Sequence, residues 1–211
     1  MADKAQRTVV KRVANAKLFS DDTILLENVR LSYPHTFVPY AGDDGGVPAY
    51  SVTALMPKVS HGEAKDLCVA IINKLMKANK IERLGADKKF IRNGDDSGKD
   101  GYDGMFSVSA REAKRPHSLG KNAKPLDPVR EADVIYGGCW GNVLIRPWCQ
   151  NNKFGKRVNA GLVAVQFLRD GEPFGENRIS KEDVEGSFDP VEGGDAFEDG
   201  LGGDDDENGG L

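Results

Sequence analysis

The sequence predicts a mainly β protein: a small β-barrel of about five strands, capped by one helix and interrupted by long loops. Five segments have the alternation or the β-branched and aromatic composition of strands. One further segment has apolar residues at helical spacing, and the last thirty residues carry twelve acidic side chains and no basic one. We therefore expect a flexible basic arm at 1–22, a β domain at 23–181 and a disordered acidic tail at 182–211.

The elements follow in a simple order along the chain. The strands are expected at residues 23–32, 50–56, 105–110, 136–149 and 158–169. Residues 61–80 are expected to form the helix, because one face collects the apolar side chains of Ala64, Leu67, Cys68, Ile71, Leu75 and Met76. Residues 33–50 contain several Pro and Gly and are expected to form a loop. The turn at 150–157 joins the last two strands as a hairpin.

Charge is distributed very unevenly along the chain. The chain has 29 Lys and Arg, 33 Asp and Glu and a formal net charge of −4. Removing the twelve acids of the tail leaves 29 bases and 21 acids, which is a net charge of +8 for residues 1–181. A basic body favours a polyanionic ligand, and an acidic tail on the same chain can compete with that ligand. The tail has few large apolar side chains and is expected to be disordered.

The strand at 136–149 carries the main candidate site. Because side chains alternate along a strand, Cys139, Gly141, Val143, Ile145 and Cys149 form one face, which is expected to be the core face. The other face carries Trp140, Arg146 and Trp148. Proteins that bind single-stranded nucleic acid stack bases on such rings and hold phosphates with cations. The alternative is that each tryptophan packs under the helix or under a loop.

Two neighbouring segments extend this candidate site. The turn after the strand carries Lys153, Phe154, Lys156 and Arg157, which could grip a strand or simply solubilise the turn. The stretch from residue 111 to residue 130 is basic and has no hydrophobic period, and its candidates for phosphate contacts are Arg111, Lys114 and Arg115. The alternative for this stretch is an ordinary solvated surface.

Signals for an enzyme or a metal site are weak. His35, His61 and His117 lie far apart, without metal-ligand spacing. The Asp-rich loop at 93–104 misses the spacing of a calcium-binding loop. The three cysteines form no CxxC pair, and no apolar run is long enough for a membrane span. We expect no enzyme activity, no cofactor and no membrane association, although a metal-dependent nuclease with scattered carboxylates stays a minor alternative.

Four stretches in order resemble a family of bacteriophage single-stranded-DNA-binding proteins with an OB-type barrel. They are Arg30–Ser32 with Tyr50–Val52, Arg92–Asp95 with Gly101–Ala110, Tyr136–Trp140, and Gly161–Gln166 with Asp170–Gly175. The order and spacing agree over most of residues 23–176. Arg92 and Tyr102 lie in the second stretch and join the candidate nucleic-acid-binding residues.

The resemblance implies a protein that coats and protects single-stranded DNA in phage replication or recombination, without sequence preference, in the cytoplasm of the infected bacterium. The tail would compete with DNA and recruit replisome or recombination proteins, and a homo-oligomer is one possible assembly. The candidate partner-binding residues are Phe188, Phe197, Asp204, Asp205, Asp206 and Glu207. The chain ends in Leu211 and not in an aromatic residue. The alternative from another class is an interaction protein whose tail mimics DNA toward host factors.

Overall fold

The computed structural model of the chain describes residues 7–42, 45–153, 155–175 and 186–187. The chain divides into two units, Met1–Phe174 and Gly175–Leu211, and the account below concerns the first unit. No helix among the described residues is long and apolar enough to cross a membrane.

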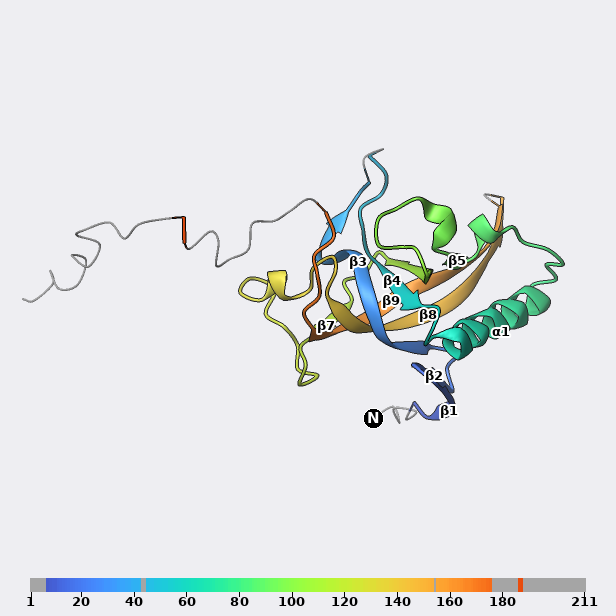
Figure 1. The fold of residues 1–211 in the computed structure, drawn as a ribbon. Coiled ribbons are helices and arrows are strands. Elements are labelled where there is room, and N and C mark those ends of the chain that lie inside the picture. Colours follow the sequence, from blue (N-terminus) through green and yellow to red (C-terminus); the bar gives the residue numbers. More distant parts are fainter. Residues whose placement is uncertain (1–6, 43–44, 154, 176–185, 188–211) are drawn as a thin grey trace, which may run out of the picture. The chain divides into compact units, whose positions relative to one another are not determined.

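The described part of the first unit is one sheet of nine strands with a single α-helix (Figure 1). The strands are β1 (Val9–Val13), β2 (Ala16–Phe19), β3 (Ile24–Tyr40), β4 (Ala49–Pro57), β5 (Ile91–Asn93), β6 (Met105–Glu112), β7 (His117–Leu119), β8 (Trp140–Asn152) and β9 (Gly155–Arg169). Their order is β5-β6-β4-β3-β8-β9-β7, and β2 pairs with both β1 and β3. Only the β7–β9 pair is parallel among these ladders.

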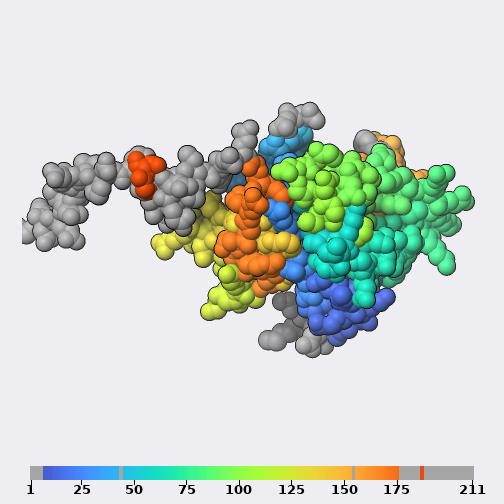
Figure 2. Space-filling view, viewed as in Figure 1, coloured from blue at the N-terminus to red at the C-terminus, as the bar shows by residue number. Residues whose placement is uncertain are grey.

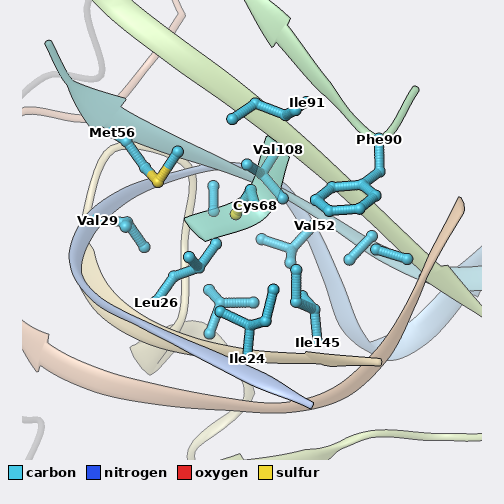
Figure 3. Close-up of a cluster of buried hydrophobic side chains, with 14 of the residues drawn as sticks. Ile24, Leu26, Val29, Val52, Met56, Cys68, Phe90, Ile91, Val108 and Ile145 are labelled. Carbon is cyan, nitrogen blue, oxygen red and sulfur yellow. The ribbon is translucent and has the colours of Figure 1, made fainter. Parts of the chain in front are cut away.

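The sheet curves strongly, so that strands far apart in the ladder meet. β6 contacts β9 although the two are not neighbours in the strand order. A parallel bridge between Lys89 and Val158 also links the segment before β5 to β9. Figure 3 shows the result, a core enclosed by the curved strands, in which Leu26, Val52 and Ile145 point toward one another.

The α-helix α1 (Gly62–Ala78) confirms the single helix that the sequence predicts at 61–80. Its buried residues are Ala64, Leu67, Cys68, Ile71, Ile72 and Met76, which is the apolar face expected from the spacing. His61 precedes the helix and is fully buried. Its Nδ1 lies 2.8 Å from the Ser60 hydroxyl and its Nε2 lies 3.0 Å from the Glu27 carbonyl oxygen, which fixes the start of the helix against β3.

The mainly β prediction is confirmed, but the strand count and some boundaries are wrong. The described residues form nine strands, not about five, because short strands such as β5 and β7 have only three residues each. β3 continues from the first predicted strand to Tyr40, through residues 33–40 that were expected in a loop. The chain tolerates Pro34 and Pro39 there because the β3–β4 register shifts between Ser32 and His35 and again before Tyr40.

Residues 7–22 are not the flexible arm that their polar composition suggested. β1 and β2 form a hairpin that adds to the edge of β3. Asn15 sits at its turn with φ of 60°, and its side-chain amide donates to the Ser60 carbonyl at 2.9 Å. The backbone N–H of Ala14 donates to the Glu63 carboxylate at 3.1 Å. These contacts with the start of α1 hold a segment whose own composition is not typical of a buried strand.

Candidate nucleic-acid interface

An open groove of about 980 Å³ runs between the outer face of β6 and the β8–β9 hairpin. We call it the groove. Its walls come from five separate segments: residues 47–49, 87–92 and 109–113, the end of β8 and the start of β9. Its basic members are Lys88, Lys89, Arg92, Arg111 and Arg157, and its acidic members are Asp87 and Glu112. The groove is therefore a net positive surface that the curvature of the sheet assembles.

Small hydroxyl side chains lie on the outer face of β6, where Ser109 lines the groove and Ser107 lines a neighbouring cavity. Ser107, Ser109 and Arg111 alternate along one face of β6, and Ser109 lies opposite Thr53 of β4. Arg92 of β5 lies opposite Ser107. Because opposite residues of a ladder share a face, the two guanidinium groups rise from a floor of hydroxyl side chains. Such a floor leaves room for a ligand above the sheet.

Backbone carbonyl groups hold the three arginines in place. Arg157 donates from Nη2 to the Asp87 carbonyl oxygen at 3.0 Å, and Arg92 donates to the same oxygen at 3.3 Å. Arg111 donates from Nη2 to the carbonyl oxygen of Val47. A carbonyl orients a guanidinium without cancelling its charge. Because a guanidinium has five N–H donors, the donors that do not bond to the carbonyl stay available for a ligand. The arginines are therefore prearranged for anionic groups.

Asp87 is the acid nearest to these cations. Its carboxylate lies 3.0 Å from the Lys88 ammonium, and both side chains are largely exposed. The hydrogen bond from Lys88 lowers the pKa of Asp87 below its ordinary value, and the charges of Lys88 and Arg157 act in the same direction. Lys88 is thus paired with a carboxylate, whereas no arginine of the groove forms an ion pair with a described carboxylate.

Trp148 faces the groove with 45% of its surface exposed. The burial pattern of β8 confirms the predicted faces: Val143 and Ile145 are buried, whereas Arg146 and Trp148 are exposed. Arg146 shares the face of Trp148 but does not line the groove. One exposed ring therefore stands beside the three arginines.

Trp140 lies at the opposite end of the same face and has a different environment. It is half-buried, with the Arg169 guanidinium 4.4 Å from the ring centroid. A side chain at Gly171 would approach the ring to about 3.0 Å, so the backbone at Gly171 covers part of it. Eight residues separate the two tryptophans, which is about 26 Å along a strand. They cannot belong to one stacking site.

The other predicted residues lie at several places. Tyr102 is only 5% exposed, and its hydroxyl donates to the Ser32 hydroxyl at 3.1 Å. Lys153 and Lys156 are exposed at the hairpin tip, and Lys114 is exposed just beyond the groove. Arg115 lies over the Phe37 ring at 5.2 Å. The remaining predicted sites lie outside the described residues: Phe154, Phe188, Phe197, Asp204, Asp205, Asp206 and Glu207.

A smaller cavity of about 280 Å³ continues the groove, since Asp87, Arg92 and Ser109 line both. It leads toward Tyr102 and Lys99, in the loop of residues 94–104. Figure 2 shows this loop, in bright green, beside residues 170–174 in orange, and a side chain added at Gly101 would clash with Phe174.

Exposed aromatic rings on β3 were missed by the sequence analysis. Tyr33 is exposed, with the Lys99 ammonium 4.5 Å from its ring centroid. Tyr40 stacks on His35 with centroids 4.7 Å apart. His35 lies opposite Ser51, which in turn lies opposite Arg111, so this stack shares the outer face of the groove. The only sequence signal was the aromatic content of a segment that its prolines assigned to a loop.

The described residues contain no group of three or more His, Cys, Asp or Glu that could hold a metal ion. Burial lowers the pKa of His35 and of His61, and the two lie on different parts of the fold. The geometry of the groove is that of a binding surface with cations, one exposed ring and small polar groups.

Comparisons with known proteins identify relatives over most of the chain. A family model described as the ssDNA-binding protein of Enterobacter phage Enc34 matches residues 22–196. The putative protein p50 of Acyrthosiphon pisum secondary endosymbiont phage 1 is 31% identical over 160 residues, which are 72% of this chain and 85% of that protein.

Solved structures give a matching result. The single-stranded DNA-binding protein from bacteriophage Enc34 in complex with ssDNA is 42% identical, with a TM-score of 0.76, over 81% of this chain and 99% of that one. A C-terminal truncation of the Enc34 protein is 42% identical, with a TM-score of 0.75, over 82% of this chain and 99% of that one. The β1–β2 hairpin precedes the residues that the family model matches.

Proposed function

The chain belongs to the family of the single-stranded-DNA-binding protein of Enterobacter phage Enc34, and on this premise we propose that it binds single-stranded DNA in the groove. The observation that carries the proposal is the exposed Trp148 ring beside three arginines that backbone carbonyls orient. The solved Enc34 protein in complex with ssDNA supports the choice of ligand. We also assign the curved sheet to the OB type of barrel.

Each component of the groove has a separate task in this proposal. Trp148 stacks on one base, which contributes about 1–3 kcal/mol with little dependence on the base. Arg92, Arg111 and Arg157 contact phosphates, which carry no sequence information. Binding is therefore expected to be independent of sequence. A duplex keeps its bases stacked in the helix, so it cannot offer a base to Trp148 and is expected to bind less tightly.

The exposed rings on β3 extend this surface. Tyr40 stacks on His35, which lies on the outer face of the sheet, and Tyr33 lies beside Lys99, which lines the cavity that continues the groove. A strand that leaves the groove along β4 would meet them next. We assign to them a secondary role in stacking, after Trp148.

We further propose that the acidic tail regulates the groove and recruits partners. The twelve acids of residues 182–211 are opposite in charge to the net positive groove, so in this proposal they occupy it when DNA is absent and compete with DNA when it is present. Phe188, Phe197 and the acids at 204–207 are the candidate contacts for replication or recombination proteins. The protein would thus coat and protect exposed strands in the infected bacterium.

Truncation after Lys181 tests the tail. It should tighten DNA binding at about 20 mM salt and have little effect near 500 mM, because salt screens contacts between exposed charges. It should also abolish binding to replication partners. A full-length variant with the tail acids changed to Asn and Gln serves as the control for chain length. An unchanged dissociation constant at low salt would leave the tail without a competitive role.

Substitution of the two tryptophans tests the groove. Trp148→Ala should weaken binding of a labelled oligonucleotide by about five- to 150-fold, the equivalent of one stacked base. Trp140→Phe is the matched control and should bind like the wild type. Quenching of tryptophan fluorescence by DNA should disappear in Trp148→Phe and persist in Trp140→Phe.

The same titration separates the alternatives. A DNA mimic would not bind the oligonucleotide even after truncation of the tail. A nuclease would degrade the oligonucleotide when magnesium is added, whereas a coating protein protects it. Either result would contradict the proposed function.

A further inference from the structure

We propose that a third cavity, where β3 meets β7, is a pocket for a single nucleobase at one end of the DNA path. The inference rests on the proposed function. The cavity has a volume of about 160 Å³, and Phe37, Arg115 and Ser118 line it together with Pro116, Pro125 and Pro128. It is separate from the groove in the described structure, since the two have no lining residue in common.

Size and wall chemistry limit what this pocket can hold. Pockets for drug-sized ligands have volumes of about 300–1,000 Å³, so 160 Å³ suits one small ring system and not a whole nucleotide. Three proline rings and the Phe37 ring give rigid apolar walls. Flat rigid walls of this kind fit a planar ring and lose little conformational entropy when they do.

The buried hydroxyl of Ser118 indicates that the ligand is polar. Ser118 is 7% exposed, and its Oγ has no hydrogen-bond partner in the described part of the chain. A buried polar group without a partner is unfavourable and rare in folded proteins. A nucleobase carries donors and acceptors on its edge and can satisfy the Ser118 hydroxyl, whereas the ring of a phenylalanine cannot.

Arg115 connects this pocket to the groove. Ala113 lines the groove and Arg115 lines the pocket, so the two sites are at most about 7 Å apart along the backbone. The exposed guanidinium of Arg115 stands 5.2 Å from the Phe37 ring centroid, at the rim of the pocket. It can hold the phosphate of the nucleotide whose base enters. One strand can therefore place a base on Trp148 and a later base against Ser118.

Single abasic sites locate the bases that matter. The probe is the shortest oligonucleotide that binds the full-length protein tightly, with one abasic site moved through each position in turn. For the wild type we expect two positions at which loss of the base weakens binding. Ser118→Ala should weaken binding of the intact oligonucleotide about three- to tenfold, the value of one hydrogen bond. At one of those two positions the abasic oligonucleotide should bind the Ser118→Ala variant as tightly as it binds the wild type. At the other position the same should hold for Trp148→Ala.

Lys114→Ala is the matched control. Lys114 is exposed, lies next to Arg115 and does not line the pocket, so its substitution should weaken intact and abasic oligonucleotides equally. Ser118→Ala should not lower the melting temperature of the protein without DNA, because the hydroxyl has no partner to lose. Arg115→Gln is a second variant and should show the same coupling as Ser118→Ala.

Three results would overturn the pocket assignment. One is an equal effect of Ser118→Ala on every oligonucleotide, intact or abasic. Another is a lower melting temperature of Ser118→Ala, which would mean that the hydroxyl is already satisfied. A third is that Ser118→Ala changes how strongly a peptide of residues 182–198 competes with the oligonucleotide. This result would place an aromatic residue of the tail in the pocket. If the wild type binds DNA but no abasic position removes the effect of Ser118→Ala, only the pocket is rejected. If the wild type does not bind DNA, the proposed function is rejected as well.

Discussion

The three arginines of the groove predict how strongly salt weakens DNA binding. Each phosphate contact to a single strand contributes about −0.7 to the slope of log K against log salt concentration. Three contacts give a slope of about −2, so affinity should fall about 20-fold between 50 and 200 mM salt. In the double variant Arg111→Gln, Arg157→Gln one contact remains. The slope should be about −0.7, and the fall about threefold.

These two arginines are the informative ones to change. Their guanidinium groups bond to the carbonyls of Val47 and Asp87 and not to carboxylates, so they retain full charge for phosphates. Gln retains an N–H donor for these carbonyls, which should keep the loops in place. The variant therefore removes charge with little change to the walls of the groove.

The assay is fluorescence polarisation of a labelled oligonucleotide at four or more salt concentrations. The matched control is Lys11→Gln, Lys77→Gln, which changes net charge by the same amount at exposed positions that do not line the groove. Its slope should stay near that of the wild type. If the control lowers the slope as much as the groove variant does, binding follows the charge of the whole body and the groove is not the site.

Three further predictions concern stability and reactivity. Burial lowers the pKa of His61 below 6.5, so as pH falls the unfolded chain takes up a proton at this residue before the folded protein does. The melting temperature should therefore drop between pH 7 and pH 5. An equally large drop in the His61→Gln variant would contradict this origin. Burial raises the pKa of Cys68 to about 12 and of Cys139 to about 11, whereas Cys149 is only half-buried. A thiol reagent at pH 8 should therefore modify only one cysteine, Cys149, in the native protein. Fast reaction of all three cysteines would contradict the burial of Cys68 and Cys139 in the core. Trp140→Ala should lower the free energy of unfolding by about 3 kcal/mol while the folded protein still binds DNA, so weaker binding without weaker stability would move Trp140 into the site.

Local patterns were sufficient for much of the fold. The period of two along β8 correctly separated Val143 and Ile145 from Arg146 and Trp148, because a strand with one buried face has no other register. The spacing of apolar residues in α1 was equally decisive. Family membership confirms the resemblance that the ordered motifs indicated, and with it the prediction of a binding protein and not an enzyme.

The errors arose where tertiary contacts override composition. Prolines at 34 and 39 indicated a loop, but register shifts accommodate both within β3. The β1–β2 hairpin depends on the hydrogen bonds of Ala14 and Asn15 to the start of α1, which no local pattern reveals. The groove has the same origin. Arg92, Arg111 and Arg157 are far apart in sequence and meet only because β6 curves toward β9.

Backbone carbonyls, and not carboxylates, hold the arginines of the groove, which leaves their charge available to a polyanion. Elsewhere some cations are matched by acids, as in Lys17–Glu27, Lys58–Asp95 and Lys74–Asp22. In the described part of the chain, by contrast, no carboxylate forms an ion pair with an arginine of the groove, and only Lys88 is paired there. A polyanion gains little by displacing an acid that already neutralises a lysine. It gains most where carbonyls hold the cations, and both a DNA strand and the acidic tail should therefore prefer the same groove.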